Sequence, residues 1–114
     1  MSRGAFQPGI SVIVPSYQGC QRLPAMVASL SAQTLAPELF EVIVVLNGPA
    51  DGSYEVLAQA RVEHPGLNLR VLTSDAPGVS RARNLGLAAV RREYVTFLDD
   101  DDCLEPRFLE VGLA

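Results

Sequence analysis

Four consecutive aspartates, Asp99 to Asp102, come directly after the apolar run Tyr94 to Leu98. Like charges this close repel one another unless a cation neutralises them. Alternate residues at a strand end point the same way, so Asp99 and Asp101 can offer two hard oxygen ligands to Mg²⁺ or Mn²⁺. That metal would bridge the protein and a diphosphate. The run also fits a solvated acidic loop, or carboxylates that offset the dipole of a following helix.

An alternation of strands and helices must position these carboxylates. Apolar runs and one alternating segment predict strands over 10–14, 41–46, 67–73 and 94–98. Apolar residues at helical spacing predict helices over 23–33, 53–63 and 79–91, and a fourth helix begins at Pro106. The order predicts an α/β fold: a Rossmann-like, doubly wound, mostly parallel sheet in an α/β/α sandwich.

In such a sheet, ligands bind beyond the carboxyl ends of the strands. This rule selects three loops, 15–21, 47–52 and 99–102. The pair Asn47-Gly48 could instead turn a hairpin, but the helical periodicity that follows favours strand, turn and helix. The break after the third strand falls at Asp75-Ala76-Pro77-Gly78.

Composition excludes several function classes. A chain of 114 residues with 48% apolar content fits one core. Its net charge of −4 argues against a nucleic-acid partner. All nine basic residues are arginine, so a P-loop lysine or a Schiff-base lysine is excluded for this chain. Cys20 and Cys103 suggest neither a disulfide framework nor a zinc site, and a reducing, cytoplasmic location is expected.

Four segments resemble, in order, the motifs of family 2 glycosyltransferases of the GT-A fold. Ser11 to Tyr17 resembles the opening S-V-I-V-P-x-Y-N, and Glu41 to Gly48 looks like the second strand with its N-G ending. Gly78 to Gly86 resembles G-x-x-x-A-R-N-x-G, and Glu93 to Asp102 resembles E-Y-V-x-F-L-D-x-D-D. The match covers the chain from residue 10, and four ordered motifs are more specific than any one.

The resemblance implies a tail over 1–9 and a nucleotide-sugar-binding half-domain over 10–114, truncated before the acceptor-binding half. The general base of an inverting enzyme would then lie beyond Ala114, so we expect donor binding and little or no transfer by these 114 residues alone. A truncated sheet would expose apolar surface, so self-association is expected. No apolar run approaches the roughly 20 residues that cross a bilayer, so membrane association, such as a place at its cytoplasmic face, would need missing segments.

The resemblance also implies a nucleotide site. Pro15, Ser16 and Tyr17 would flank the base and ribose. Asn47 stands where the family usually has an aspartate that reads a uracil-type base edge. An amide is both donor and acceptor, so a uridine, guanosine or thymidine donor stays open. Asn47 fits a plain turn residue before Gly48 equally well.

Charged residues would act on the diphosphate. Arg83 matches the arginine of the family's R-N pair and would neutralise donor phosphate, with Arg81 a weaker candidate. One of these arginines could instead form an ion pair with the acidic loop, Asp99 to Asp102. By resemblance, Asp101 is the direct metal ligand together with Asp99, and Asp100 would approach the donor's ribose or sugar.

The predicted function is metal-dependent, inverting transfer of a sugar from a nucleoside-diphosphate sugar to a hydroxyl acceptor, such as a glycan or lipid, that the chain does not identify. One alternative is a non-catalytic nucleotide-binding or regulatory remnant of the same fold. Another is a phosphoryl-transfer domain, which is disfavoured because phosphatases of the haloacid dehalogenase type place their D-x-D after the first strand, where this chain has Pro15-Ser16-Tyr17. No G-x-G-x-x-G follows the first strand, which disfavours a dinucleotide-binding oxidoreductase.

Overall fold

The computed structural model describes residues 6–74 and 78–113. Its elements in chain order are β1 (Gln7–Tyr17), α1 (Leu23–Ser31), η2 (Pro37–Leu39), β2 (Phe40–Asn47), α2 (Ser53–Glu63), β3 (Leu69–Ser74), α3 (Val79–Ala89), β4 (Arg92–Phe97) and α4 (Phe108–Leu113). Most of the predicted tail, and the predicted break at 75–77, lie outside the described residues.

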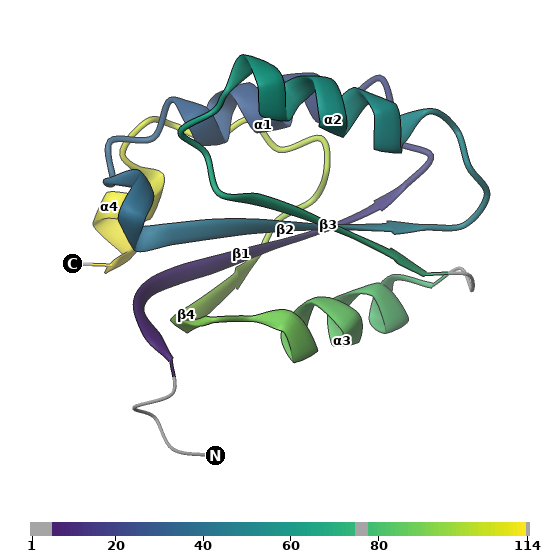
Figure 1. Ribbon diagram of the computed structural model, residues 1–114. Coiled ribbons are helices and arrows are strands. Elements are labelled where there is room, and N and C mark those ends of the chain that lie inside the picture. The colour runs from purple at the N-terminus through teal and green to yellow at the C-terminus, as the bar shows by residue number, and fades with distance from the viewer. Residues whose placement is uncertain (1–5, 75–77, 114) are drawn as a thin grey trace.

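The strands form one sheet in the order β3-β2-β1-β4, and every pair is parallel. Helices α1 and α2 cover one face of the sheet, and α3 covers the other (Figure 1). The predicted fold class is therefore confirmed. In this topology the carboxyl ends of all the strands meet at one edge, so the loops that follow β1, β2 and β4 become neighbours.

Alternation along β1 divides the core between the two faces. Val12 and Val14 belong to the larger cluster under α1 and α2, whereas Ile13 packs under α3. Helix α3 approaches β1 closely at Gly86, where an added Cβ would clash with the Ile13 side chain. Because this core fixes β1 between its neighbours, the loop after β1 starts from a rigid support.

Several element boundaries differ from the predicted ones. β1 begins at Gln7, earlier than predicted, because the Gln7 backbone N–H donates to the Arg91 carbonyl at 2.8 Å and the residue pairs with Arg92. α3 ends at Ala89, earlier than predicted, because β4 begins at Arg92. The short helix η2 was not predicted.

A buried carboxylate joins strands near their amino ends. Glu41 of β2 is fully buried and accepts hydrogen bonds from Ser11 Oγ at 2.7 Å, from the Arg91 backbone N–H at 2.8 Å and from Arg70 Nη1 at 3.0 Å. Burial alone would raise the pKa of Glu41, but these hydrogen bonds and the Arg70 charge outweigh it and hold the pKa below its ordinary value. The network therefore keeps Glu41 charged and ties β1, β2 and β3 together.

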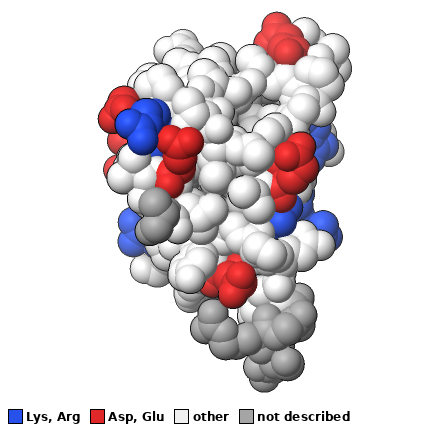
Figure 2. All heavy atoms as spheres, turned by 90° about the vertical axis from the view of Figure 1, so that its left-hand side faces the viewer, with Lys and Arg blue, Asp and Glu red and all other residues white. Residues whose placement is uncertain are grey.

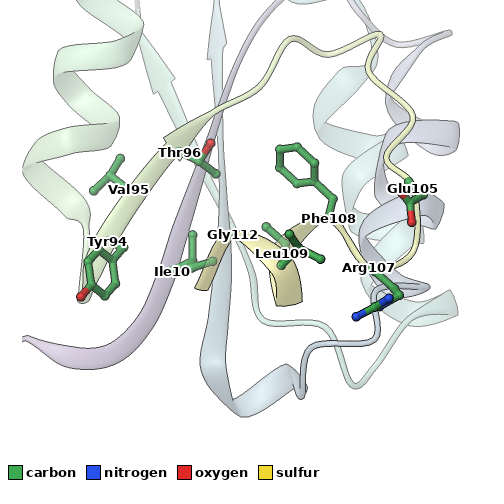
Figure 3. A pocket seen from close by; sticks show the side chains of 10 residues that line it. Ile10, Tyr94, Val95, Thr96, Glu105, Arg107, Phe108, Leu109 and Gly112 are labelled. Carbon is green, nitrogen blue, oxygen red and sulfur yellow. The ribbon is translucent and has the colours of Figure 1, made fainter. Parts of the chain in front are cut away.

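Apolar side chains remain exposed around β4 and α4. A pocket of about 470 Å³ lies between these two elements, with Tyr94, Val95 and Thr96 on the β4 side and Phe108 and Leu109 on the α4 side (Figure 3). On the face that includes α4, charged side chains of both signs stand around a broad uncharged area (Figure 2). The expected self-association stays a prediction. No helix within the described ranges is long and apolar enough to cross a membrane.

Candidate functional site

The loops after β1, β2 and β4 meet around an open cavity of about 500 Å³ at the carboxyl edge of the sheet. Its lining residues are Pro15, Tyr17, Arg22, Asn47, Gly78, Val79, Asp99, Asp100 and Asp101. Every predicted site residue except Ser16 and Arg83 is in this set. The topology therefore brings together residues that lie more than eighty positions apart in the sequence, and the start of α3 completes the wall.

Tyr17 and Asn47 form the wall between β1 and β2, where they are paired in register. The Tyr17 ring is half exposed and lies against Gly48, where an added Cβ would clash with it. Gly48 has φ +85°, so the tight turn after β2 also favours glycine. Asn47 is buried and reaches a second, smaller cavity of about 240 Å³ that Ser16 also lines.

Asp51 ties the loop after β1 to the loop after β2. Its Oδ2 accepts a hydrogen bond from the Cys20 backbone N–H at 3.2 Å, and its Oδ1 accepts one from the Ser53 backbone N–H at 3.0 Å. The second bond satisfies a free N–H in the first turn of α2. The two loops are therefore held in a fixed relation on this side of the site.

The aspartates of the acidic loop differ in burial and in hydrogen bonding. Asp100 is buried, and its side chain is 12% exposed. Arg22 Nε donates to Asp100 Oδ1 at 2.9 Å, Arg22 Nη2 donates to Oδ2 at 3.0 Å, and Ser16 Oγ donates to Oδ2 at 2.7 Å. Burial raises the pKa of Asp100. The hydrogen bonds from Arg22 and Ser16 and the Arg22 charge lower it by more than burial raises it, so the pKa lies below its ordinary value. Asp100 is therefore an ion-paired carboxylate with both oxygens engaged.

Asp99 and Asp101 are exposed, and within the described residues neither carboxylate has a hydrogen bond or ion pair with another group of the protein. The backbone N–H of Asp99 donates to Asp102 Oδ2 at 2.9 Å, so Asp102 closes the loop on itself. Among the residues the structure describes, no group of three or more His, Cys, Asp or Glu side chains is arranged to hold a metal. Two unengaged carboxylates beside an open cavity fit Mg²⁺ or Mn²⁺, provided that a ligand's oxygens and water complete the shell.

Neither of the two candidate arginines of α3, Arg81 and Arg83, lines the cavity. The Arg83 guanidinium stands over the Phe97 ring, 5.5 Å from its centroid. It does not line the cavity, so its predicted contact with phosphate remains a prediction. The acidic loop does form an ion pair with an arginine, but the partner is Arg22 and not Arg81 or Arg83.

Sequence reasoning missed Arg22. The predicted loop 15–21 ends one residue before it, and the arginines predicted to pair with the aspartates are those of α3. A signal was available, because Arg22 is the one arginine near the loop that follows the first strand. What the sequence could not supply was the close approach of this loop to Asp100, which depends on Gly19.

Comparison with known proteins places the chain in a family. The family described as "Glycosyl transferase family 2" matches residues 11–114. Glycosyltransferase AglE of Haloferax volcanii is 32% identical over 108 residues, which cover 94% of this chain and 35% of AglE. The chain spans about a third of the length of the first curated relatives it matches.

Solved structures show the same fold. The fragment 1–349 of Staphylococcus aureus TarS in complex with UDP matches with a TM-score of 0.83 at 29% identity, over 91% of this chain and 30% of that one. Mannosyltransferase PcManGT from Pyrobaculum calidifontis, in complex with GDP-Man and Mn²⁺, matches with a TM-score of 0.78 at 26% identity, over 84% of this chain and 28% of that one. With its motifs, its sheet and its matched residues in agreement, the chain belongs to glycosyl transferase family 2.

Proposed function

We propose that the chain forms the donor-binding part of a metal-dependent, inverting glycosyltransferase that uses a nucleoside-diphosphate sugar. The observation that carries this proposal is the pair of exposed carboxylates, Asp99 and Asp101, beside the cavity, with the aspartate between them neutralised by Arg22. The similar TarS and PcManGT structures contain UDP and GDP-Man with Mn²⁺, respectively, which supports the ligand class.

Asp101 and Asp99 would hold Mg²⁺ or Mn²⁺, and the ion would stabilise the negative charge that develops on the departing diphosphate. Pro15 and Tyr17 would flank the nucleotide from the β1 side of the cavity. Asn47 is placed where its amide could meet a base edge from either cavity, and a donor-acceptor pair of this kind is compatible with more than one base.

Transfer itself requires a base that deprotonates the acceptor hydroxyl. We assign that base to none of the described residues, and we leave the acceptor as a hydroxyl compound of a glycan, lipid or other class. On this proposal the chain alone binds the donor in the cytoplasm and transfers little sugar.

The test is a calorimetric titration with UDP and with GDP, with and without Mn²⁺, on the wild type and on Asp101→Ala. The matched control is Glu38→Ala, which removes an exposed carboxylate on η2. We expect Mn²⁺-dependent binding of one nucleotide that is lost in Asp101→Ala and kept in the control. Binding that ignores the metal, or a folded wild type that binds neither nucleotide, would overturn the proposal and favour a remnant of the fold without this site.

A further inference from the structure

Asp100, in the middle of the acidic loop, is bound by residues of the loop after β1, which we call the Asp100 receptor. Ser16, Gly19 and Arg22 surround the Asp100 carboxylate, while Asp99 and Asp101 on either side remain exposed. Asp100 is 78 residues from Arg22 in the sequence and 84 residues from Ser16. This contact is therefore a tertiary connection between two loops that both line the cavity.

Arg22 makes this connection with directional bonds. Its Nε and Nη2 each donate to a different oxygen of Asp100, and Nη2 also donates to the Tyr17 carbonyl at 3.1 Å. The Arg22 backbone is itself anchored, since its N–H donates to the Gly19 carbonyl at 2.9 Å at the start of α1. A planar guanidinium can engage both carboxylate oxygens at once, which a lysine ammonium does not reproduce.

Gly19 allows the two loops to approach. It is buried, and a Cβ at this position would clash with Asp100 Oδ2 and with Ser16 Oγ. The space that a side chain would fill is thus occupied by the carboxylate and its serine partner. A loop that only passed near Asp100 by chance would not need this close fit.

The charges of the loop explain what the receptor achieves. Arg22 neutralises Asp100 within the protein, so the free carboxylates facing the cavity are Asp99 and Asp101, and their charge matches that of one divalent cation. An unheld Asp100 would add a third negative charge and let the loop rotate, so that the two flanking carboxylates would no longer be presented together.

We propose that Arg22 is a positioning residue: through Asp100 it fixes the acidic loop so that Asp99 and Asp101 are presented to the metal and the donor diphosphate. This inference rests on the proposed function. Groups that orient metal ligands typically change metal affinity by about 10- to 100-fold when they are removed. We expect a loss of that size in Mn²⁺-dependent nucleotide binding for Arg22→Gln.

The experiment measures Mn²⁺-dependent binding of UDP and of GDP to wild type, Arg22→Gln, Arg22→Lys, Asp100→Asn and the double variant Arg22→Gln/Asp100→Asn. Arg22→Lys should restore only a small part of the binding lost in Arg22→Gln, because lysine keeps the charge but cannot donate to both Asp100 oxygens as the guanidinium does. The double variant should lose less than the product of the two single losses, because both act through one contact. The control is Arg107→Gln, which breaks an exposed ion pair with Glu110 of α4.

A second readout needs no ligand. Amide hydrogen exchange over residues 99–102 should become faster in metal-free Arg22→Gln, while exchange in α2 stays as in wild type.

If wild type binds nucleotide with Mn²⁺ and Asp101→Ala does not, but Arg22→Gln binds like wild type, the positioning role is wrong and the proposed function stands. If wild type binds neither nucleotide, the positioning role and the proposed function are both wrong. Full recovery by Arg22→Lys would also overturn the role, since charge alone would then suffice.

Discussion

Two carboxylate clusters of nearly the same composition contact β1, one near the amino end of β2 and the other at the carboxyl end of β1. In each, a serine of β1 donates to the carboxylate at 2.7 Å and an arginine from another segment supplies the countercharge: Ser11 and Arg70 for Glu41, Ser16 and Arg22 for Asp100. The serines are five positions apart, which is roughly 16 Å along a strand. A serine, an arginine and a carboxylate thus occur together once toward each edge of the sheet.

The clusters differ in their exposure to water and in their neighbours. The Glu41 side chain is 0% exposed and that of Arg70 is 23% exposed, whereas Arg22 is 45% exposed and lines a cavity. A fully buried carboxylate contributes to stability only while all its partners are present, so the amino-end cluster locks strands together. The carboxyl-end cluster lies beside unengaged carboxylates, and its arginine is partly exposed at the wall of the cavity. One arrangement of residues therefore serves architecture at one end and the site at the other.

The largest expected effect comes from breaking the buried cluster. Arg70→Leu removes the charge partner of Glu41 and also a hydrogen bond to the Ala89 carbonyl at the end of α3. Because an uncompensated carboxylate would remain in the interior, we expect a loss of about 3 kcal/mol in the free energy of unfolding. Urea unfolding measures it. A loss below about 1 kcal/mol would show that the two clusters do not differ in the way described.

The second expected effect is the pH dependence of stability. The folded-state pKa of Glu41 is depressed, so the carboxylate contributes stability that is complete above its ordinary pKa of about 4.5 and is lost as the pH falls through the lower folded value. The slope contributed by one such group is at most about 1.4 kcal/mol per pH unit. In Glu41→Gln, urea unfolding below pH 4.5 should show a shallower dependence on pH than in wild type. Glu38→Gln, on the exposed helix η2, is the control and should keep the wild-type slope.

The third effect concerns the site more than the fold. Gly19→Ala forces Asp100 and Ser16 to shift, because the new methyl group would occupy their space. We expect nucleotide binding with Mn²⁺ to weaken by about 10-fold, equivalent to about 1.4 kcal/mol. Gly52→Ala is a matched control within a loop of the same edge, since a Cβ there meets nothing within 4 Å, although its φ of +91° adds local strain. Equal losses of nucleotide affinity in both variants would mean that general loop strain, and not the Asp100 receptor, explains the result.

The contrast between the clusters also marks what a sequence can predict. The β-branched runs 10–14 and 41–46 and the run 94–98 are dictated by local pattern, and the structure confirms each as a strand. The position of the acidic loop follows because the aspartates end the last of these runs. Parallel pairing then requires that the loops meet, whichever side chains they carry.

The partners within the site could not be predicted in this way. The sequence already separated Asp100 from Asp99 and Asp101 by the alternation of residues at a strand end, but it did not predict that Asp100 would be buried against Gly19 and Arg22. Glu41 likewise gave no sign that it would be enclosed, because it occupies the first position of an apolar run. Side-chain pairing across 78 or 29 residues depends on register and loop shape, which residue spacing does not encode.

The smallest expected effect tests Arg83, an arginine that belongs to neither cluster. Arg83 is predicted by resemblance to bind donor phosphate, and in the structure it stacks on Phe97. Phe97→Leu removes the ring and should cost about 0.5–1 kcal/mol of stability, while leaving the guanidinium free. Arg83→Gln should cost a similar amount but should also weaken binding of the nucleotide diphosphate. Since Arg70 and Arg22 are each committed to a carboxylate, loss of binding in Arg83→Gln but not in Phe97→Leu would identify Arg83 as an arginine that contacts the ligand. Unchanged binding in both variants would reduce its role to the ring contact.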